Sequence, residues 1–154
     1  EIVERKDTLV AGLVDSFGVH DKANIFELWD KFPERVSELK VADTNTYGVV
    51  MMHLPTHELK LGHDKFYMAA APVEPESELP PDMVQLTLAG GPYAKFTHHG
   101  PLSQFEKTLV EVCSWQPEAP YMMRHAPMYE MYDQRFKFEE ADSVFDVYIP
   151  LEKI

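Results

Sequence analysis

The stretch SVFDVYIPL, residues Ser143–Leu151, alternates large apolar side chains with other residues and therefore predicts a β-strand. Side chains two positions apart point to the same face of a strand. One face of this strand consists of Phe145, Val147, Ile149 and Leu151. We expect this apolar face to pack beneath helices, with Asp146, Tyr148 and Pro150 on the opposite face.

The end of this strand has a counterpart in the first half of the chain. Tyr148-Ile149-Pro150-Leu151 resembles Ala70-Ala71-Pro72-Val73, which closes another strand-like run. The elements that precede each ending also occur in the same order, namely strand, helix, strand and strand. This order predicts an internal duplication in which each half covers one face of an antiparallel sheet with a helix.

The predicted elements of the first half occupy residues 1–73. Thr8–Phe17 reads as a strand, and an amphipathic helix follows from Asp21, with apolar residues at Ile25, Trp29, Phe32 and Val36. Pro33 lies within that pattern, so we expect a kink or break near Phe32. Tyr47–Leu54 and Lys65–Val73 then predict a hairpin.

The predicted second half spans residues 83–154, after an acidic, proline-rich connector at residues 74–82. Its expected strands are Met83–Leu88, Tyr93–His98, Met128–Asp133 and Ser143–Leu151. Phe105, Leu109 and Val112 mark its helix. The chain is therefore expected to be a single α+β domain over residues 1–154. Its halves are expected to be related by a pseudo-twofold axis, with a ligand groove between them.

The charge of the chain narrows its possible partners. The 154 residues carry 26 acidic and 14 basic side chains, for a formal net charge of −12. Binding to phosphate backbones depends on basic residues, so we expect no direct nucleic-acid binding by this chain. No apolar run approaches the roughly 20 residues of a membrane span. With one cysteine and no secretory signal at the start, the sequence is expected to be cytoplasmic.

The strand Met128–Asp133 contains the strongest candidate for a functional residue. Alternation places Glu130 on one face with Met128 and Tyr132. If that face lines the groove, the carboxylate is partly desolvated, and a cationic ligand would offset the cost of keeping it charged. Aromatic rings nearby would add cation–π attraction of about 0.5–2 kcal/mol each. The alternative, which strand parity leaves open, is that Glu130 is solvated on an open strand face.

Several motifs in fixed order resemble a known family. They are YAKFTHHGPL from Tyr93, a helix, then Trp115 with Pro117, APMYEMYD from Ala126, and FDVYIPL from Phe145. This pattern resembles the GyrI-like (gyrase-inhibitor-like) effector-binding domain, which serves as the C-terminal sensor of AraC-type and MerR-type transcription regulators. YGVV from Tyr47 and FYMAAAPV from Phe66 extend the resemblance over nearly the whole chain.

The resemblance implies a groove that binds small lipophilic, often cationic molecules, with Glu130 in the position of the family's central glutamate. It also places Tyr148, Tyr47 and Trp115 in the groove, and Tyr132 shares the face of Glu130. Strand parity adds Phe66 and Met68. The ligand signal would reach the transcription apparatus through a DNA-binding domain elsewhere in a longer protein, or through a separate protein.

Two other functions remain open from the sequence. A desolvated Glu130 beside tyrosines could act as general base in a hydrolase of small electrophilic compounds. The chain shows no nucleophile paired with a base, so we expect binding rather than catalysis and assign no catalytic residue. The acidic surface could instead bind a basic protein partner.

Neither a metal ion nor another cofactor is expected. Seven histidines are present, but those at His53, His57 and His63 and the adjacent His98 and His99 show no tight ligand spacing. Cys113 lies beside the apolar stripe of the second predicted helix, so we expect it to be an inert buried thiol.

Overall fold

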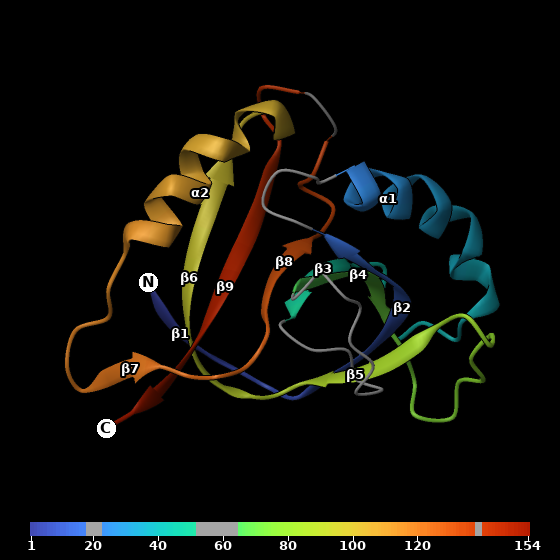
Figure 1. The fold of residues 1–154 in the computed structure, drawn as a ribbon, viewed down its shortest axis with the longest axis horizontal. Coiled ribbons are helices and arrows are strands. Elements are labelled where there is room, and N and C mark those ends of the chain that lie inside the picture. Colours follow the sequence, from blue (N-terminus) through green and yellow to red (C-terminus); the bar gives the residue numbers. More distant parts are fainter. Residues whose placement is uncertain (18–22, 52–64, 138–139) are drawn as a thin grey trace.

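The computed structural model describes residues 1–17, 23–51, 65–137 and 140–154. These residues form one curled antiparallel sheet with two helices, which confirms the α+β class. The helices are α1 (Ala23–Arg35) and α2 (Phe105–Ser114). Figure 1 shows them on opposite sides of the molecule, with the middle strands of the sheet between them.

The strands of the described chain pair in the order β1-β6-β9-β8-β3-β4-β2-β5, and β7 pairs with β9 beside this path. Their bounds are β1 (Ile2–Arg5), β2 (Thr8–Phe17), β3 (Thr46–Met51), β4 (Lys65–Pro72), β5 (Val84–Leu88), β6 (Gly91–His99), β7 (Tyr121–Met123), β8 (Met128–Tyr132) and β9 (Val144–Lys153). The expected strands are present, although residues 52–54 of the third lie outside the described residues. β1 and β7 were not predicted.

The sheet order is symmetric about the β8–β3 pair. β2-α1-β3-β4 in the first half corresponds to β6-α2-β8-β9 in the second, which is the expected repeat of strand, helix, strand and strand. The two edge strands are exchanged between the halves. β1 of the first half pairs with β6 of the second, and β5 of the second half pairs with β2 of the first. Each half therefore supplies an edge strand to the other. The division at residues 73 and 83 stays a prediction.

Helix α1 follows the predicted apolar stripe. Phe32 and Leu28 are buried against β2 and β4, with Ile25 and Trp29 beside them. The helix does not stop near Phe32, since it continues through Pro33 to Arg35 and then tightens into a 3-10 turn at Val36–Glu38. Pro33 has no backbone N–H, so the last turn of α1 lacks the hydrogen bond that residue 33 would otherwise donate to the carbonyl oxygen of Trp29. The expected cap at Asp21 lies outside the described residues.

The sheet has two faces with different partners. On the face that we call the helix face, α1 packs over the first half, and α2 packs over the apolar side of β9, as expected. The α2 cluster contains Val112, Phe145, Val147, Ile149 and Leu151. The opposite face, here the tyrosine face, holds a buried cluster that includes Tyr47, Tyr93, Tyr129 and Tyr148.

The acidic connector contributes no strand in the structure. It is held to the first half by contacts of Asp82 with Arg35 and by the Lys40–Glu76 ion pair, in which Nζ and Oε1 lie 2.6 Å apart. Within the described residues, neither helix combines the length and the apolar content that a bilayer crossing requires.

Candidate functional site

Glu130 lies in the middle of the sheet, on β8, the strand next to the symmetry axis. In the strand register it faces Val147 of β9 on one side and Gly48 of β3 on the other. Because Val147 belongs to the cluster under α2, this register places Glu130 on the helix face. Its side chain is half-buried. The structure therefore favours a partly desolvated carboxylate over a fully solvated one.

Two tyrosine hydroxyls donate hydrogen bonds to the same oxygen of Glu130. The Tyr67 hydroxyl lies 2.7 Å from Oε1, and the Tyr132 hydroxyl lies 3.0 Å from it. Tyr67 comes from β4 of the first half and Tyr132 from β8 of the second. The carboxylate of Glu130 therefore accepts one hydrogen bond from each half. Hydrogen bonds to a carboxylate are stronger than those between neutral groups, and two of them fix the position of Glu130.

Trp29 of α1 completes the arrangement. Its indole Nε1 donates to the Tyr67 hydroxyl at 3.0 Å. Its ring contacts Tyr67 and Tyr132 edge to face, with centroids 6.4 and 5.6 Å away. Trp29, Tyr67 and Tyr132 thus surround the carboxylate with aromatic rings from a helix and two strands. We refer to these three residues and Glu130 as the Glu130 site.

The tyrosines of the Glu130 site stay protonated near neutral pH. Burial, followed by the negative charge of Glu130, raises the pKa of Tyr67 well above its usual value. The same two causes raise the pKa of Tyr132. Both hydroxyls therefore act as donors to the carboxylate rather than as charged groups.

The structure brings together only part of the predicted ligand-binding set. Tyr132 contacts Glu130, whereas four other predicted residues belong to the buried cluster of the tyrosine face. These four are Tyr47, Phe66, Met68 and Tyr148. In β4 the residue between Phe66 and Met68 is Tyr67, which points to the helix face. Sequence alternation shows that Tyr67 lies on the opposite side of β4 from Phe66 and Met68. Only the strand pairing shows that the side of Tyr67 is also the side of Glu130. Val50 of β3 lies opposite both Tyr67 and Met128, and Met128 shares its face of β8 with Glu130.

Trp115 packs against the α2 cluster. It caps the C-terminal end of α2, and its ring packs edge-on against Phe96 at 5.5 Å. Conversely, the sequence analysis did not single out Tyr67 and placed Trp29 only on the apolar stripe of the helix. The only signal for Trp29 was its place on the helix stripe, which does not distinguish a site residue from a core residue. Its hydrogen-bonding indole N–H becomes evident only in the fold.

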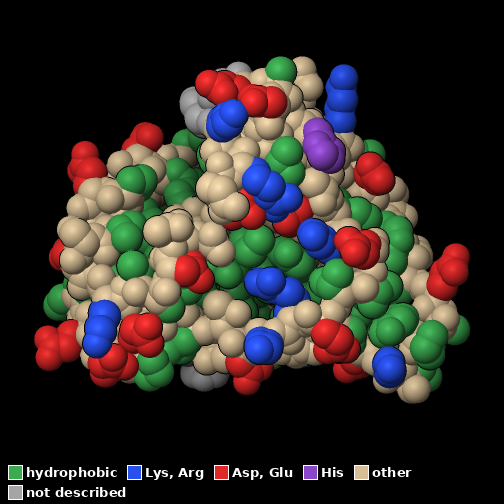
Figure 2. All heavy atoms as spheres, turned by 180° about the vertical axis from the view of Figure 1, so that it is seen from behind, with side chains coloured by type: hydrophobic (Ala, Val, Ile, Leu, Met, Phe, Trp, Pro, Cys, Tyr) green, Lys and Arg blue, Asp and Glu red, His purple; other side chains and the backbone are tan. Residues whose placement is uncertain are grey.

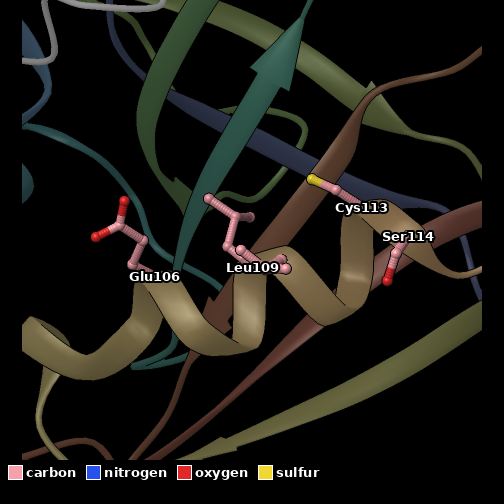
Figure 3. A pocket seen from close by; sticks show the side chains of 5 residues that line it. Glu106, Leu109, Cys113 and Ser114 are labelled. Carbon is pink, nitrogen blue, oxygen red and sulfur yellow. The ribbon is translucent and has the colours of Figure 1, made fainter.

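An open hollow on α2 is separate from the Glu130 site. It is lined by Glu106, Leu109, Val110, Cys113 and Ser114, on one side of the helix (Figure 3). Cys113 is exposed there, so the expectation of a buried thiol was wrong. The neighbouring Val112 is the residue that enters the core, since consecutive helix positions point about 100° apart.

In the described part of the chain, no group of three or more His, Cys, Asp or Glu side chains is arranged to hold a metal ion. His98 is buried, and its ring nitrogens lie 2.7 Å from the Thr108 hydroxyl and 3.1 Å from the Pro101 carbonyl oxygen. These contacts give it a structural role in the second half. His53, His57 and His63 lie outside the described residues.

Replacing Trp29 with Phe should lower the free energy of unfolding by about 0.5–1.5 kcal/mol, because it removes the donor to the buried Tyr67 hydroxyl. Urea denaturation followed by circular dichroism measures this change. Trp115→Phe is the matched control for ligand binding, because Trp115 lies outside the Glu130 site. If Trp115→Phe changes the affinity for a small-molecule ligand more than Trp29→Phe does, the ligand does not bind at the Glu130 site.

Comparison with known proteins assigns the chain to a family. The model of the GyrI-like small molecule binding domain matches residues 1–152. The chain belongs to the GyrI-like family. A search of curated protein sequences gave no match. The assignment agrees with the resemblance in the sequence motifs and makes this chain a small-molecule binding domain.

Solved structures share the fold of this GyrI-like domain. SAV2435 bound to tetraphenylphosphonium has 14% identity and a TM-score of 0.69, covering 99% of this chain and 93% of that one. EcmrR in its DNA complex has 14% identity and a TM-score of 0.72, covering 100% of this chain and 57% of EcmrR. A hydrolase encoded by lin2189 from Listeria innocua has 8% identity and a TM-score of 0.58, covering 99% and 91%.

Proposed function

We propose that this GyrI-like domain senses lipophilic cations and holds them at the Glu130 site. The observation that carries the proposal is the half-buried carboxylate of Glu130, which accepts hydrogen bonds from Tyr67 and Tyr132. The negative charge attracts a cation, and the surrounding rings favour one with an apolar, polarisable surface. The complex of the similarly folded SAV2435 with tetraphenylphosphonium supports this class of ligand.

The same arrangement accounts for how binding could be signalled. Trp29, Tyr67 and Tyr132 pack against one another, so a ligand that reaches the carboxylate replaces part of these ring contacts. Trp29 belongs to α1 in the first half and Tyr132 to β8 in the second half. Such a change would therefore alter side-chain packing in both halves of the domain. The fold is also present in EcmrR, which has been solved with DNA, and this supports a role as the effector domain of a transcription regulator.

Isothermal titration calorimetry with tetraphenylphosphonium tests the proposal, with triphenylphosphine oxide as a neutral aromatic control. We expect the cation to bind and the neutral compound to bind at least about tenfold more weakly, because only the cation interacts with the charge of Glu130. Trp29 fluorescence should respond to the cation in the Trp115→Phe variant, which retains one indole. Equal affinities for the two compounds would reject recognition of charge.

Hydrolysis is the second candidate function. Glu130 lies 2.7 Å from a protonated tyrosine hydroxyl, so one group could accept a proton while the other stabilises developing negative charge. The likeness to the fold of the Listeria innocua hydrolase supports keeping this candidate. Turnover of a strained electrophile such as an epoxide, abolished in Glu130→Gln, would favour the enzyme over the sensor.

A further inference from the structure

Tyr132 of the Glu130 site packs against an aromatic residue that does not belong to the site, Phe136. The centres of the two rings lie 4.8 Å apart at an interplanar angle of 71°, and both rings contact Phe145 of β9. Edge-to-face contacts of this kind favour one orientation of each ring. The Tyr132 ring also contacts Trp29, and its hydroxyl donates to Glu130. Phe136 therefore helps to determine where that hydroxyl points.

Phe136 lies in the loop after β8, and a tight turn fixes the backbone at the start of this loop. Oδ1 of Asp133 accepts a hydrogen bond from the backbone N–H of Arg135 at 3.0 Å, and the carbonyl oxygen of Asp133 accepts one from the N–H of Phe136 at 3.0 Å. Aspartate side chains commonly form turns of this type. The carbonyl oxygen of Arg135 in turn accepts from the N–H of Val144 in β9 at 3.1 Å. The turn therefore holds Arg135 and Phe136 beside the start of β9.

The side chain of Arg135 attaches the loop to the sheet. Its Nε lies 2.9 Å from Oδ1 of Asp133, and its Nη2 lies 2.6 Å from Oδ2 of Asp146. The strand register pairs Asp146 with Met131, whose side chain belongs to the cluster of the tyrosine face. Arg135 thus bonds to a residue of the tyrosine face, whereas Phe136 packs against the α2 cluster on the helix face. The loop is therefore held on both sides of the sheet.

The carboxylate of Asp146 is buried, which makes its bond to Arg135 a strong anchor. Figure 2 shows many Asp and Glu side chains on the surface of the molecule, where water solvates them. The Asp146 side chain is only 1% exposed, and the Thr97 hydroxyl donates to its Oδ1 at 2.8 Å. A buried carboxylate that loses its cationic partner is strongly destabilised. The Arg135–Asp146 ion pair therefore opposes movement of the loop that carries Phe136.

We propose that Arg135 and Phe136 are positioning residues of the Glu130 site. Arg135 anchors the loop after β8, and the anchored loop keeps the Phe136 ring packed against Tyr132. In this orientation the Tyr132 hydroxyl stays on the carboxylate of Glu130, which fixes the carboxylate for a ligand. The effect on ligand affinity rests on the function proposed above, whereas the effect on the arrangement of the side chains does not depend on any ligand.

Fluorescence of Trp29 tests the positioning in the absence of ligand. The Trp115→Phe background retains Trp29 as its single indole, and the centre of the Trp29 ring lies 5.6 Å from that of Tyr132. We expect Phe136→Leu to shift the Trp29 emission to longer wavelength, because displacement of the Tyr132 ring exposes more of the indole to water. Arg135→Gln should produce a shift in the same direction, since it releases the loop that carries Phe136.

Two further variants make the fluorescence result specific to the ring at position 136. Phe136→Tyr keeps the ring and should restore the emission spectrum of the parent protein. Phe96→Leu is the matched control, because Phe96 is another partly buried ring beside the α2 cluster, but its ring contacts residue 115. This control should leave the Trp29 spectrum unchanged. Loss of stability alone also leaves the native spectrum unchanged in the absence of denaturant.

Calorimetry with tetraphenylphosphonium measures the consequence for binding. We expect Arg135→Gln and Phe136→Leu each to weaken binding by about three- to tenfold, the effect of a residue that acts on the ligand through its neighbour. Lys137→Gln is the matched control for charge, because it removes a positive charge from an exposed ion pair in the same loop and should not change the affinity. In a Tyr132→Phe background, which lacks the hydroxyl, Phe136→Leu should weaken binding less than it does in wild type.

The results distinguish failure of the positioning from failure of the proposed function. An unchanged Trp29 spectrum in both Phe136→Leu and Arg135→Gln would overturn the positioning. Equal losses of affinity with and without the Tyr132 hydroxyl would overturn it as well. If Phe136→Leu does not fold, the spectrum of Arg135→Gln decides the question. If wild type does not bind tetraphenylphosphonium, the function proposed above fails, and the spectra alone support or overturn the positioning.

Discussion

Replacing Glu130 with Gln is expected to weaken tetraphenylphosphonium binding by about 1–3 kcal/mol, or roughly 5- to 150-fold in dissociation constant. Gln keeps the size of the side chain and an oxygen that can accept from Tyr67 and Tyr132. The substitution therefore removes the negative charge with little change in shape. Calorimetry on the wild type and the variant measures the loss.

Two controls make this result specific to charge at the Glu130 site. The affinity for neutral triphenylphosphine oxide should change much less, because its contacts are with the rings. Glu111→Gln removes the same charge from an exposed position on α2 and should leave both ligands unaffected. Equal affinity of wild type and Glu130→Gln for the cation, with no loss of any turnover, would show that Glu130 is an ordinary strand residue.

Glu130→Gln also separates the sensor from the hydrolase. A general base must accept a proton, which Gln cannot do, so an enzyme would lose turnover while keeping much of its affinity. A sensor would lose affinity and has no turnover to lose. The two outcomes are read from the same purified variant by calorimetry and by product formation.

Gly48→Ala should destabilise the fold by about 1–3 kcal/mol and disrupt the Glu130 site, because the position has no room for a side chain. A Cβ atom there would lie 1.9 Å from the Tyr67 hydroxyl oxygen and 2.5 Å from Oε1 of Glu130. Gly48 pairs with Glu130 on one side and with Ala69 on the other. The space above this glycine is where the Tyr67–Glu130 hydrogen bond forms.

A double-mutant cycle with Tyr67→Phe tests this explanation. Removing the hydroxyl removes the closest of the clashing atoms, so Gly48→Ala should cost less in the Tyr67→Phe background than in wild type. Urea denaturation of the four proteins gives the coupling energy, and tetraphenylphosphonium binding should fall in each variant. Additive costs would mean that the clash with Tyr67 is not the reason why position 48 is a glycine.

The sequence indicated the order of the elements because that order depends on local patterns. Alternation over Ser143–Leu151 and helical spacing around Phe32 are visible within ten to fifteen residues, and they persist in the fold as β9 and α1. The repeated order of strand, helix, strand and strand followed from these patterns. The shared face of Glu130 and Tyr132 was also predictable, because both residues lie two positions apart on one strand.

The tertiary structure decided which residues from other strands join that face. Alternation divides β3 and β4 into two sides, but a shift of one residue in the pairing would reverse the side that meets Glu130. Backbone hydrogen bonds between distant segments set that register, so Tyr67 and Gly48 reach the carboxylate, while Tyr47 and Phe66 lie on the tyrosine face.

The exchange of edge strands between the halves and the contact of Trp29 with Tyr67 were also decided by the tertiary structure. The residues of β1 and β6 are far apart in sequence, and no local pattern predicts that the first strand of one half pairs with the other half. Trp29 became a site residue only because α1 lies across β4, where its indole reaches Tyr67. The sequence by itself therefore determined the elements and the central carboxylate, whereas non-local pairing and helix packing determined the residues that surround it.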